Sequence, residues 1–440
     1  MRIDSDGMKF VSPSGVVAMT VEALRELANT HIGQNHPSET PYEKMTSGLK
    51  LPRNRKTSMN PFVTHFECSL EGKHYPTGPA YRLSEAGRPM LVRYDLDRIA
   101  ARVDRDEVAA RSGGFFKWEE LLPFEDAARV PRLGEIDTPL IRLGSVPSVV
   151  VKDEGRLPTG SFKARGLALA VSMAVELGID KLCMPSNGNA GAALAAYASR
   201  AGLKSLVYCP ADTPRMNIDE TRLCGAEVVE IDGYIDDCGK LLAERAAAEG
   251  WFDVSTLKEP YRLEGKKTMG LELAAQHNWS LPNAIFYPTG GGTGLIGMWK
   301  AFAEMKAMGW ITGSLPRMFA VQAEGCAPMV RAWEAGDEFA QRWENAQTRA
   351  AGIRVPQAVG DFLILQTVRE SDGRAVAVSE AEIERSWREL ALQDGVLMCP
   401  EGAATHAAWR RMVAEGHLAT DAEALLFNCA TGLKYELPSY

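Results

Sequence analysis

The chain has 440 residues, of which 45% are hydrophobic and 24% charged, and its formal net charge is −8 at pH 7. This composition is that of an ordinary globular protein, and the length suits two or three domains with a large core. The scattered lysines and arginines form no basic stripe for nucleic acid, and no apolar run approaches the roughly 20 residues of a membrane helix.

The N-terminal residues contain no apolar run of a signal peptide, and their acidic side chains argue against a transit peptide, so we expect a cytoplasmic protein. The eight cysteines are dispersed, and no two form a CxxC pair. We therefore expect reduced thiols rather than a disulfide framework or a cysteine zinc site.

Residues 1–60 are rich in Asn, Pro, Ser and Lys and are predicted to form an N-terminal extension, with one short amphipathic helical piece at 21–28. Residues 61–112 are predicted to form a small strand-rich segment, whose last strand lies within LVRYDL (91–96).

From about residue 113, short apolar runs alternate with helical stretches, which predicts an α/β fold with mostly parallel sheets covered by helices. We expect a large domain from 113–170 and 284–440, and a small α/β domain from 171–283. Ligands in such sheets bind at the carboxyl ends of the strands. The predicted strands lie at 149–152, 182–185, 205–209, 227–231, 284–288, 319–323 and 424–428, and examples of the predicted helices lie at 188–202, 236–250 and 379–393.

Lys163 stands on the first turn of a predicted helix, after a strand and a Pro/Gly/Ser turn in VVVKDEGRLPTGSFKARG (149–166). Desolvation and the positive end of the helix dipole would both disfavour its ammonium form, which suits a nucleophilic lysine. A solvated lysine near a helix start is the alternative that position alone allows.

The string around Lys163 distinguishes these alternatives. PTGSFKARG (158–166) resembles the cofactor-lysine motif of fold-type-II pyridoxal-phosphate enzymes, and KDEG…PTGSFKARG resembles threonine synthase in particular. The resemblance covers most of residues 66–437 and implies pyridoxal 5'-phosphate as cofactor, Lys163 as the residue that carries it, and a homodimer. Further segments that resemble this family lie at 116–146, 211–233 and 399–408.

The glycine loop in YPTGGGTGLIGMWKAF (287–302) lies between a strand and a helix. Converging backbone N–H groups and a helix N-terminus favour an anion, although a tight packing turn would leave the same pattern. The resemblance implies that Gly290, Gly291, Gly292 and Thr293 cup the cofactor phosphate.

Two further segments match motifs that contact the cofactor ring. PSNGNAG (185–191) resembles the S-x-G-N motif, which places Asn189 beside the ring hydroxyl; helix capping is the alternative role of this residue. NCATGLKY (428–435) resembles T-x-x-G-L-K, whose threonine faces the ring nitrogen. Cys429 holds that position and Thr431 lies two residues further on; we favour Cys429, which could also be a small buried hydrophobe.

The segment 68–96 resembles the zinc ribbon that some threonine synthases carry, but Cys68 alone is kept. Glu71, Leu83 and Ala86 stand at the other ligand positions. Because a tetrahedral zinc site needs four N, S or O ligands, no zinc is predicted there.

The substrate motif also departs from the family. In VSTLKEPYRLEGKKT (254–268), Ser255 and Arg262 are kept but the asparagines are not, and PTGGGTGL resembles serine and threonine dehydratases. Ser186, Ser255 and Arg262 are candidates to bind the anionic groups of an amino-acid substrate. Arg262 with Lys258 could instead be a solvated surface pair.

The resemblance implies a threonine synthase, which converts O-phospho-L-homoserine and water to L-threonine and phosphate. A serine/threonine dehydratase or another enzyme of β-elimination or replacement is the first alternative. A catalytically silent pyridoxal-phosphate-binding protein is the second, and a nucleotide-binding protein is the third.

Overall fold

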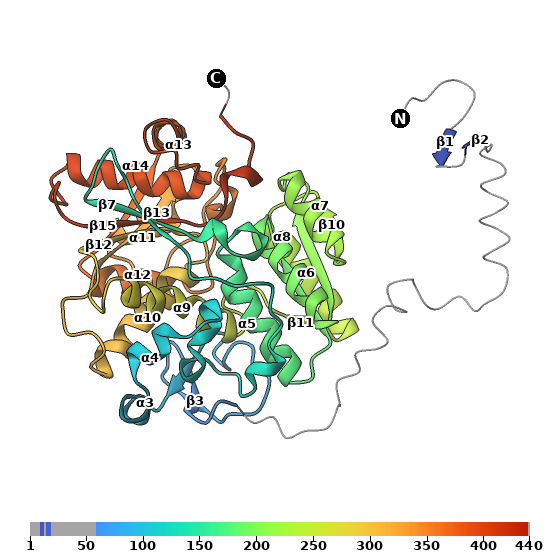
Figure 1. The fold of residues 1–440 in the computed structure, drawn as a ribbon, viewed down its shortest axis with the longest axis horizontal. Helices are drawn as coiled ribbons and strands as arrows, with labels where there is room; N and C mark the ends of the chain where they lie inside the picture. The colour runs from blue at the N-terminus through green and yellow to red at the C-terminus, as the bar shows by residue number, and fades with distance from the viewer. Residues whose placement is uncertain (1–8, 13–14, 19–58, 439–440) are drawn as a thin grey trace. The chain divides into compact units, whose positions relative to one another are not determined.

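A computed structural model describes residues 9–12, 15–18 and 59–438, and it divides into two units, Met1–Arg53 and Asn54–Tyr440. The described residues of the first unit form a hairpin of β1 (Lys9–Ser12) and β2 (Gly15–Ala18), which pair antiparallel. The predicted helical piece at 21–28 lies outside the described residues. Figure 1 shows the elements of both units.

The second unit begins with a three-stranded antiparallel sheet in the order β4-β3-β5. Its strands are β3 (Val63–Cys68), β4 (His74–Tyr75) and β5 (Met90–Tyr94). Two helices follow, α3 (Leu96–Arg102) and α4 (Arg105–Ala110). The segment predicted as strand-rich up to residue 112 therefore ends in helices.

A six-stranded sheet, ordered β14-β13-β12-β15-β7-β6, forms the centre of the second unit. All its pairs are parallel except β6 with β7. Its strands are apolar on both faces because helices cover both, as parallel sheets require. The strands are β6 (Leu140–Arg142), β7 (Val149–Asp153), β12 (Ala284–Pro288), β13 (Arg317–Ala323), β14 (Arg374–Val378) and β15 (Ala424–Asn428).

Successive residues of these strands enter two separate cores. Phe286 and Phe319 stack with their centroids 4.3 Å apart in the core beneath α13 (Glu380–Asp394) and α14 (Pro400–Ala414). Their strand neighbours Ile285 and Met318 belong to the core on the other face. Figure 1 shows α13 and α14 on one side of the strands and α9, α10 and α12 on the other. The helices of that second side are α5 (Lys163–Glu176), α9 (Tyr261–Gln276), α10 (Thr293–Ala307), α11 (Pro328–Ala335) and α12 (Asp361–Glu370).

The other parallel sheet has four strands in the order β10-β9-β8-β11. On one face α8 packs over a small core that contains Cys183, Leu206 and Leu242, and α6 packs on the other face. The elements are β8 (Lys181–Pro185), α6 (Asn189–Ala201), β9 (Lys204–Pro210), α7 (Arg215–Leu223), β10 (Glu227–Ile231), α8 (Ile235–Glu249) and β11 (Phe252–Asp253).

The observed architecture confirms the predicted fold class, with helices over two mostly parallel sheets. Each predicted strand is present, and β6, β11 and β14 were not anticipated. The strands of the two parallel sheets fall within the predicted large and small domains, although the domain boundaries themselves stay a prediction. Within the described part of the chain, no helix has the length and apolar character needed to span a bilayer.

Candidate active site

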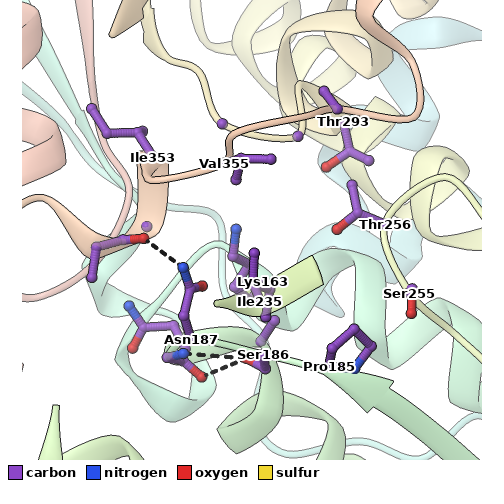
Figure 2. A pocket seen from close by; sticks show the side chains of 18 of the residues that line it. Lys163, Pro185, Ser186, Asn187, Ile235, Ser255, Thr256, Thr293, Ile353 and Val355 are labelled. Atoms are coloured by element: carbon purple, nitrogen blue, oxygen red, sulfur yellow. Dashed lines mark hydrogen bonds between the residues drawn. The ribbon is translucent and has the colours of Figure 1, made fainter. Parts of the chain in front are cut away.

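A cavity of about 480 Å³ opens where strands of both parallel sheets end. The segments after β7, β12 and β15 contribute to it, and these three strands are neighbours in the six-stranded sheet. The segment after β8 contributes from the four-stranded sheet. In Figure 2 the side chain of Lys163 lies between Ser186 and Asn187 on one side and Thr256 and Thr293 on the other. The carboxyl ends of the strands thus meet at one pocket, as expected for an α/β fold.

Lys163 is the first residue of α5 and its side chain lines the cavity. The preceding residue is fixed because the Phe162 N–H donates to the Cys429 carbonyl oxygen at 2.9 Å. The Lys163 side chain is partly exposed to the cavity but lies deep within the protein. Desolvation, aided by the positive charge of Arg262, lowers the pKa of Lys163 to about 8. Near neutral pH a useful fraction of the amine is therefore uncharged and nucleophilic.

A second lysine lies directly behind Lys163. Lys266, on α9, is fully buried and donates a hydrogen bond to the Phe162 carbonyl oxygen. Its Nζ lies 3.8 Å from the centroid of the Phe162 ring, and the Nζ of Lys163 lies 4.2 Å from the same centroid. Desolvation and the charges of Lys163 and Arg262 lower the pKa of Lys266 well below its usual value. Sequence reasoning did not find Lys266, because only the packing of α9 against α5 brings it here.

The glycine loop after β12 comes too close to its neighbours to carry side chains. A Cβ on Gly290 would lie 2.9 Å from the Gly352 carbonyl oxygen, and one on Gly291 would lie 2.6 Å from Cγ2 of Thr256. Gly292 has a φ of 76°, which favours glycine, and Thr293 begins the 15-residue helix α10. The loop therefore presents bare backbone at a helix N-terminus, which is a favourable site for a phosphate.

Asn189 begins α6, but its side chain does not cap the helix. Its Nδ2 donates to the Tyr435 hydroxyl at 3.0 Å, while the buried Oδ1 has no hydrogen-bond partner in the structure. Burial and the charge of Glu401 raise the pKa of Tyr435 well above its usual value, so the phenol stays protonated. Because buried polar atoms are nearly always satisfied, the free Oδ1 indicates that a hydrogen-bonding ligand group belongs beside it.

Of the two candidates for the ring nitrogen, Cys429 lines the cavity and Thr431 does not. The Thr431 hydroxyl accepts from the Leu433 N–H at 3.3 Å, at the start of a short 3-10 helix (Gly432–Lys434). Desolvation raises the pKa of Cys429 to about 12, so it presents a neutral thiol.

Of the predicted substrate-binding residues, two line the cavity and one does not. Ser186 and Ser255 line the cavity. Arg262 does not: it is 1% exposed, and its Nη1 donates to the Val254 carbonyl oxygen at 2.7 Å. It is therefore neither a cavity residue nor a solvated surface residue. Lys258, its predicted partner, lines the cavity, and its Nζ lies 3.1 Å from Asp253 Oδ2.

Several other lining residues escaped the sequence analysis. Asn187 and Tyr435 lie inside the motifs already singled out, so those motifs contained the signal. Thr256 follows Ser255 in the segment 254–268, so that motif also contained the signal for it. Lys240 on α8 and Glu401 on α14 come from helices distant in sequence, and no local pattern marks them.

These residues fit pyridoxal phosphate group by group. The cofactor presents an aldehyde, a phosphate, a ring hydroxyl and a ring nitrogen. The pocket offers an amine of lowered pKa, a side-chain-free glycine loop, an unpaired amide oxygen and a neutral thiol, contributed by Lys163, Gly290–Gly292, Asn189 and Cys429.

Comparisons with known proteins agree with this fit. Residues 131–430 match the family model described as pyridoxal-phosphate dependent enzyme. The threonine synthase of Methanocaldococcus jannaschii is 30% identical over 374 residues, covering 83% of this chain and 92% of that protein. The threonine synthase of Methanosarcina acetivorans is 34% identical over 366 residues, covering 81% and 89%.

A similar fold occurs in solved structures. A T.th. threonine deaminase aligns with a TM-score of 0.57 and 27% identity, covering 69% of this chain and 94% of that one. The threonine deaminase isoform 2 of Solanum lycopersicum aligns with a TM-score of 0.58 and 20% identity, covering 67% and 84%. The chain therefore belongs to the family of pyridoxal-phosphate-dependent enzymes, and over most of its length it is similar to threonine synthases.

Proposed function

We propose that this enzyme is a threonine synthase, a lyase that converts O-phospho-L-homoserine and water to L-threonine and phosphate. The similarity to curated threonine synthases over more than four fifths of the chain supports this. The observation that carries it in the structure is a second set of polar groups beyond those that the cofactor needs. These groups, from Ser186, Asn187, Lys240, Ser255, Thr256 and Lys258, line the half of the cavity that β8, α8 and the loop after β11 contribute.

We assign the cofactor contacts as follows. Gly290, Gly291, Gly292 and Thr293 hold the phosphate, Asn189 meets the ring hydroxyl, and the neutral thiol of Cys429 faces the ring nitrogen. Bound pyridoxal phosphate supplies an electron sink that stabilises negative charge at the α-carbon of an amino acid.

Lys163 is the group that moves protons. Its Nζ removes the proton from the substrate Cα and relays protons at the neighbouring carbons, acting in turn as base and acid. A pKa of about 8 places both forms of the amine within reach at neutral pH. Over the cycle the Cγ–O bond breaks with release of phosphate, the oxygen of one water bonds to Cβ, and Cγ becomes the methyl group of threonine.

The substrate phosphate is proposed to bind near Lys258, with the hydroxyls of Ser255 and Thr256 beside it. A salt bridge of 3.1 Å to half-buried Asp253 holds the Lys258 ammonium in place. The Ser255 N–H also donates to Asp253, at 2.9 Å, so one carboxylate orients both residues. Charge-assisted hydrogen bonds of this kind suit a phosphate dianion better than a neutral hydroxyl substrate.

A dehydratase that acts on serine or threonine is the second candidate. The GGGTG sequence of the phosphate loop favours it, as does the fold similarity to the T.th. threonine deaminase. The cofactor contacts would be the same, and the phosphate contacts at Lys258 would then have no substrate group to bind.

The deciding experiment follows absorbance and products with O-phospho-L-homoserine, and separately with L-serine and L-threonine. A threonine synthase releases phosphate and threonine in equal amounts from the first substrate and little ammonia from the others. Replacing Lys258 with Ala should raise KM for O-phospho-L-homoserine at least about tenfold, since one charge-assisted contact is lost. The Lys204→Ala variant is the matched control, because Lys204 is exposed at the start of β9. Ammonia from serine or threonine without phosphate release from phosphohomoserine would establish the dehydratase instead.

The homodimer and the cytoplasmic location stay part of the proposal. Sedimentation of the purified protein tests the first of these directly.

A further inference from the structure

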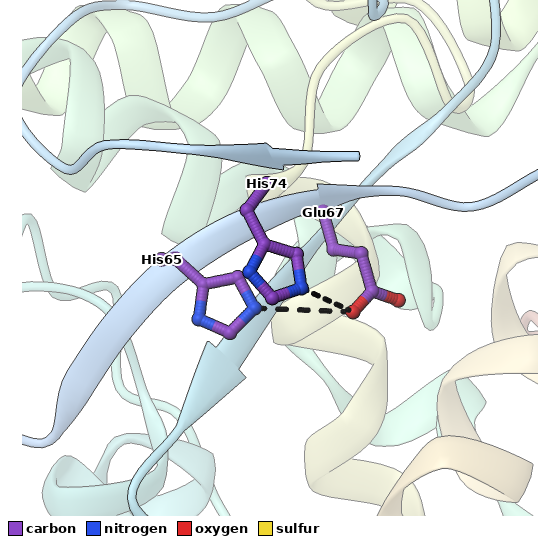
Figure 3. Close-up of side chains that lie close together, drawn as sticks. All are labelled: His65, Glu67 and His74. Atoms are coloured by element: carbon purple, nitrogen blue, oxygen red, sulfur yellow. Dashed lines mark ion pairs between the residues drawn. The ribbon is translucent and has the colours of Figure 1, made fainter. Parts of the chain in front are cut away.

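Three potential metal ligands lie together on the small antiparallel sheet, away from the active-site cavity. Alternation along β3 places His65 and Glu67 on one face and buried Phe66 and Cys68 on the other. The register pairs Glu67 with His74 of β4. Figure 3 shows the two imidazoles and the carboxylate converging on the same face. Within the described part of the chain, no other group of three such residues comes as close together.

The distances suit a shared ion. The Nε2 atoms of His65 and His74 lie 3.8 and 3.6 Å from Oε2 of Glu67, and the three ligand atoms lie within 4.8 Å of one another. Zinc binds nitrogen and oxygen at about 2.1 Å, so neighbouring ligand atoms of a tetrahedral site lie about 3.4 Å apart. Both histidine–glutamate distances are slightly longer than this, so a small inward movement of the side chains would complete the site. The His74 side chain is 64% exposed and free to adjust.

Neighbouring groups orient two of the ligands. The Thr64 hydroxyl donates to the Arg93 carbonyl oxygen at 3.1 Å and contacts His65 Nδ1 at 2.9 Å. When the single hydroxyl proton points to the Arg93 carbonyl, the hydroxyl accepts from Nδ1–H of His65. In the neutral ring, Nε2 then has a lone pair that faces Glu67, and this buried atom has no hydrogen-bond partner. Arg93 Nη2 binds Oε1 of Glu67 at 2.6 Å and turns Oε2 toward the histidines.

We propose that His65, Glu67 and His74 bind one divalent transition-metal ion, with zinc the best match. Two imidazoles and one carboxylate are borderline ligands that zinc accepts in three-residue sites, where water fills the fourth position. A lone pair facing a carboxylate oxygen is repulsive unless a proton or a metal cation lies between them, and the two imidazoles around one carboxylate oxygen supply the place for a metal ion. The contacts from Thr64 and Arg93 are the outer hydrogen bonds that usually accompany a metal site.

This site is distinct from the ribbon position for which no zinc was predicted. That prediction concerned Cys68 and the residues at 71, 83 and 86. Cys68 lies on the opposite face of β3, where its thiol donates to the Ser84 hydroxyl at 3.2 Å, so it cannot bind the same ion. Sequence spacing alone gave no signal, because the ligand set depends on the pairing of β3 with β4. The ion would join these two strands, of which β4 has only two residues.

The test uses the full-length enzyme with its cofactor, treated with EDTA and then titrated with Zn²⁺ by calorimetry, with metal content measured after dialysis. We expect one Zn²⁺ per chain that His74→Ala removes or weakens at least about tenfold. The His417→Ala variant is the matched control, because His417 is a half-exposed histidine 3.6 Å from Glu415. It should bind as the unmodified protein does.

Co²⁺ distinguishes the ligands. A site of nitrogen and oxygen shows d–d absorption without an intense thiolate band, whereas binding by a cysteine would show that band and overturn the assignment. Equal Zn²⁺ binding by His74→Ala and the unmodified protein would also overturn it, as would no binding at micromolar Zn²⁺. An unchanged cofactor absorption band verifies that each variant is folded.

Discussion

Replacing Arg165 with Met should destabilise the enzyme far more than replacing a surface arginine. Arg165 lies two residues after Lys163, and its side chain is fully buried. Its Nε and Nη2 bind the two oxygens of Glu154 at 2.7 and 2.8 Å, and Nη2 binds Glu272 at 2.9 Å. Burial alone would raise the pKa of Glu272, but Arg165 and Lys152 outweigh it and lower that pKa to about 2.

The loss of unfolding free energy depends on which partners the mutation leaves for Glu272 and Glu154. Glu272 keeps Lys152 at 2.6 Å, whereas Glu154 keeps only the Thr138 hydroxyl, at 2.7 Å, among the side-chain partners described. An uncompensated buried charge of this kind costs about 3–5 kcal/mol of unfolding free energy. Lysine at this position cannot make the bidentate contact. The unfolding free energy of Arg165→Lys should therefore lie between those of the unmodified enzyme and of Arg165→Met.

Urea unfolding, monitored by tryptophan fluorescence, measures the loss of unfolding free energy. Arg215→Met is the control, since Arg215 pairs with Asp219 at 2.7 Å while 66% exposed, and such surface pairs contribute about 0–1 kcal/mol. Because Arg165 ties α5 to the residue after β7 and to α9, its loss should also weaken cofactor retention. If the unfolding free energy of Arg165→Met were within about 1 kcal/mol of that of Arg215→Met, the buried ion pairs of Arg165 would not stabilise the fold in this way.

Three further predictions concern the cofactor pocket. In cofactor-free enzyme, the rate of covalent cofactor capture should rise as pH increases through about 8 and then level off, because the neutral Lys163 amine is the nucleophile; stopped-flow absorbance measures this, and a pH-independent rate would contradict it. Cys429, with a pKa of about 12, should resist iodoacetamide at pH 7.5 even without cofactor, as peptide mapping would show. Gly291→Ala should weaken cofactor binding at least about tenfold, since its Cβ would lie 2.6 Å from Thr256, while Gly313→Ala, with open space around it, should not; equal affinities would argue against the phosphate loop.

The parts of the fold that sequence predicted are those where burial is continuous along the chain. The core strands appear as uninterrupted apolar runs because helices cover both faces, as in β12 and β15. Two of the missed strands are too short for such a run, since β6 has three residues and β11 has two. The third, β14, has an apolar run of alternating alanine and valine that the sequence analysis did not single out.

The site was predictable where one contiguous motif supplies both the side chain and its turn. Lys163, Asn189 and Gly290–Gly292 lie in the turns or at the helix starts that follow β7, β8 and β12, and strand ends in a parallel sheet converge. Arg262 does not line the cavity, and the sequence does not reveal which face of α9 turns toward it. Lys266 and Glu401 were missed because their positions depend on the packing of distant helices.

The most direct test of the central claim is to reduce the purified, pyridoxal-phosphate-loaded enzyme with borohydride and map the modified peptide by mass spectrometry. The structure predicts one pyridoxyl-phosphate group per chain, on Lys163, and none in the Lys163→Ala variant. A modification on Lys266 or Lys258 in the unmodified enzyme, or no modification at all, would contradict the assignment of this pocket.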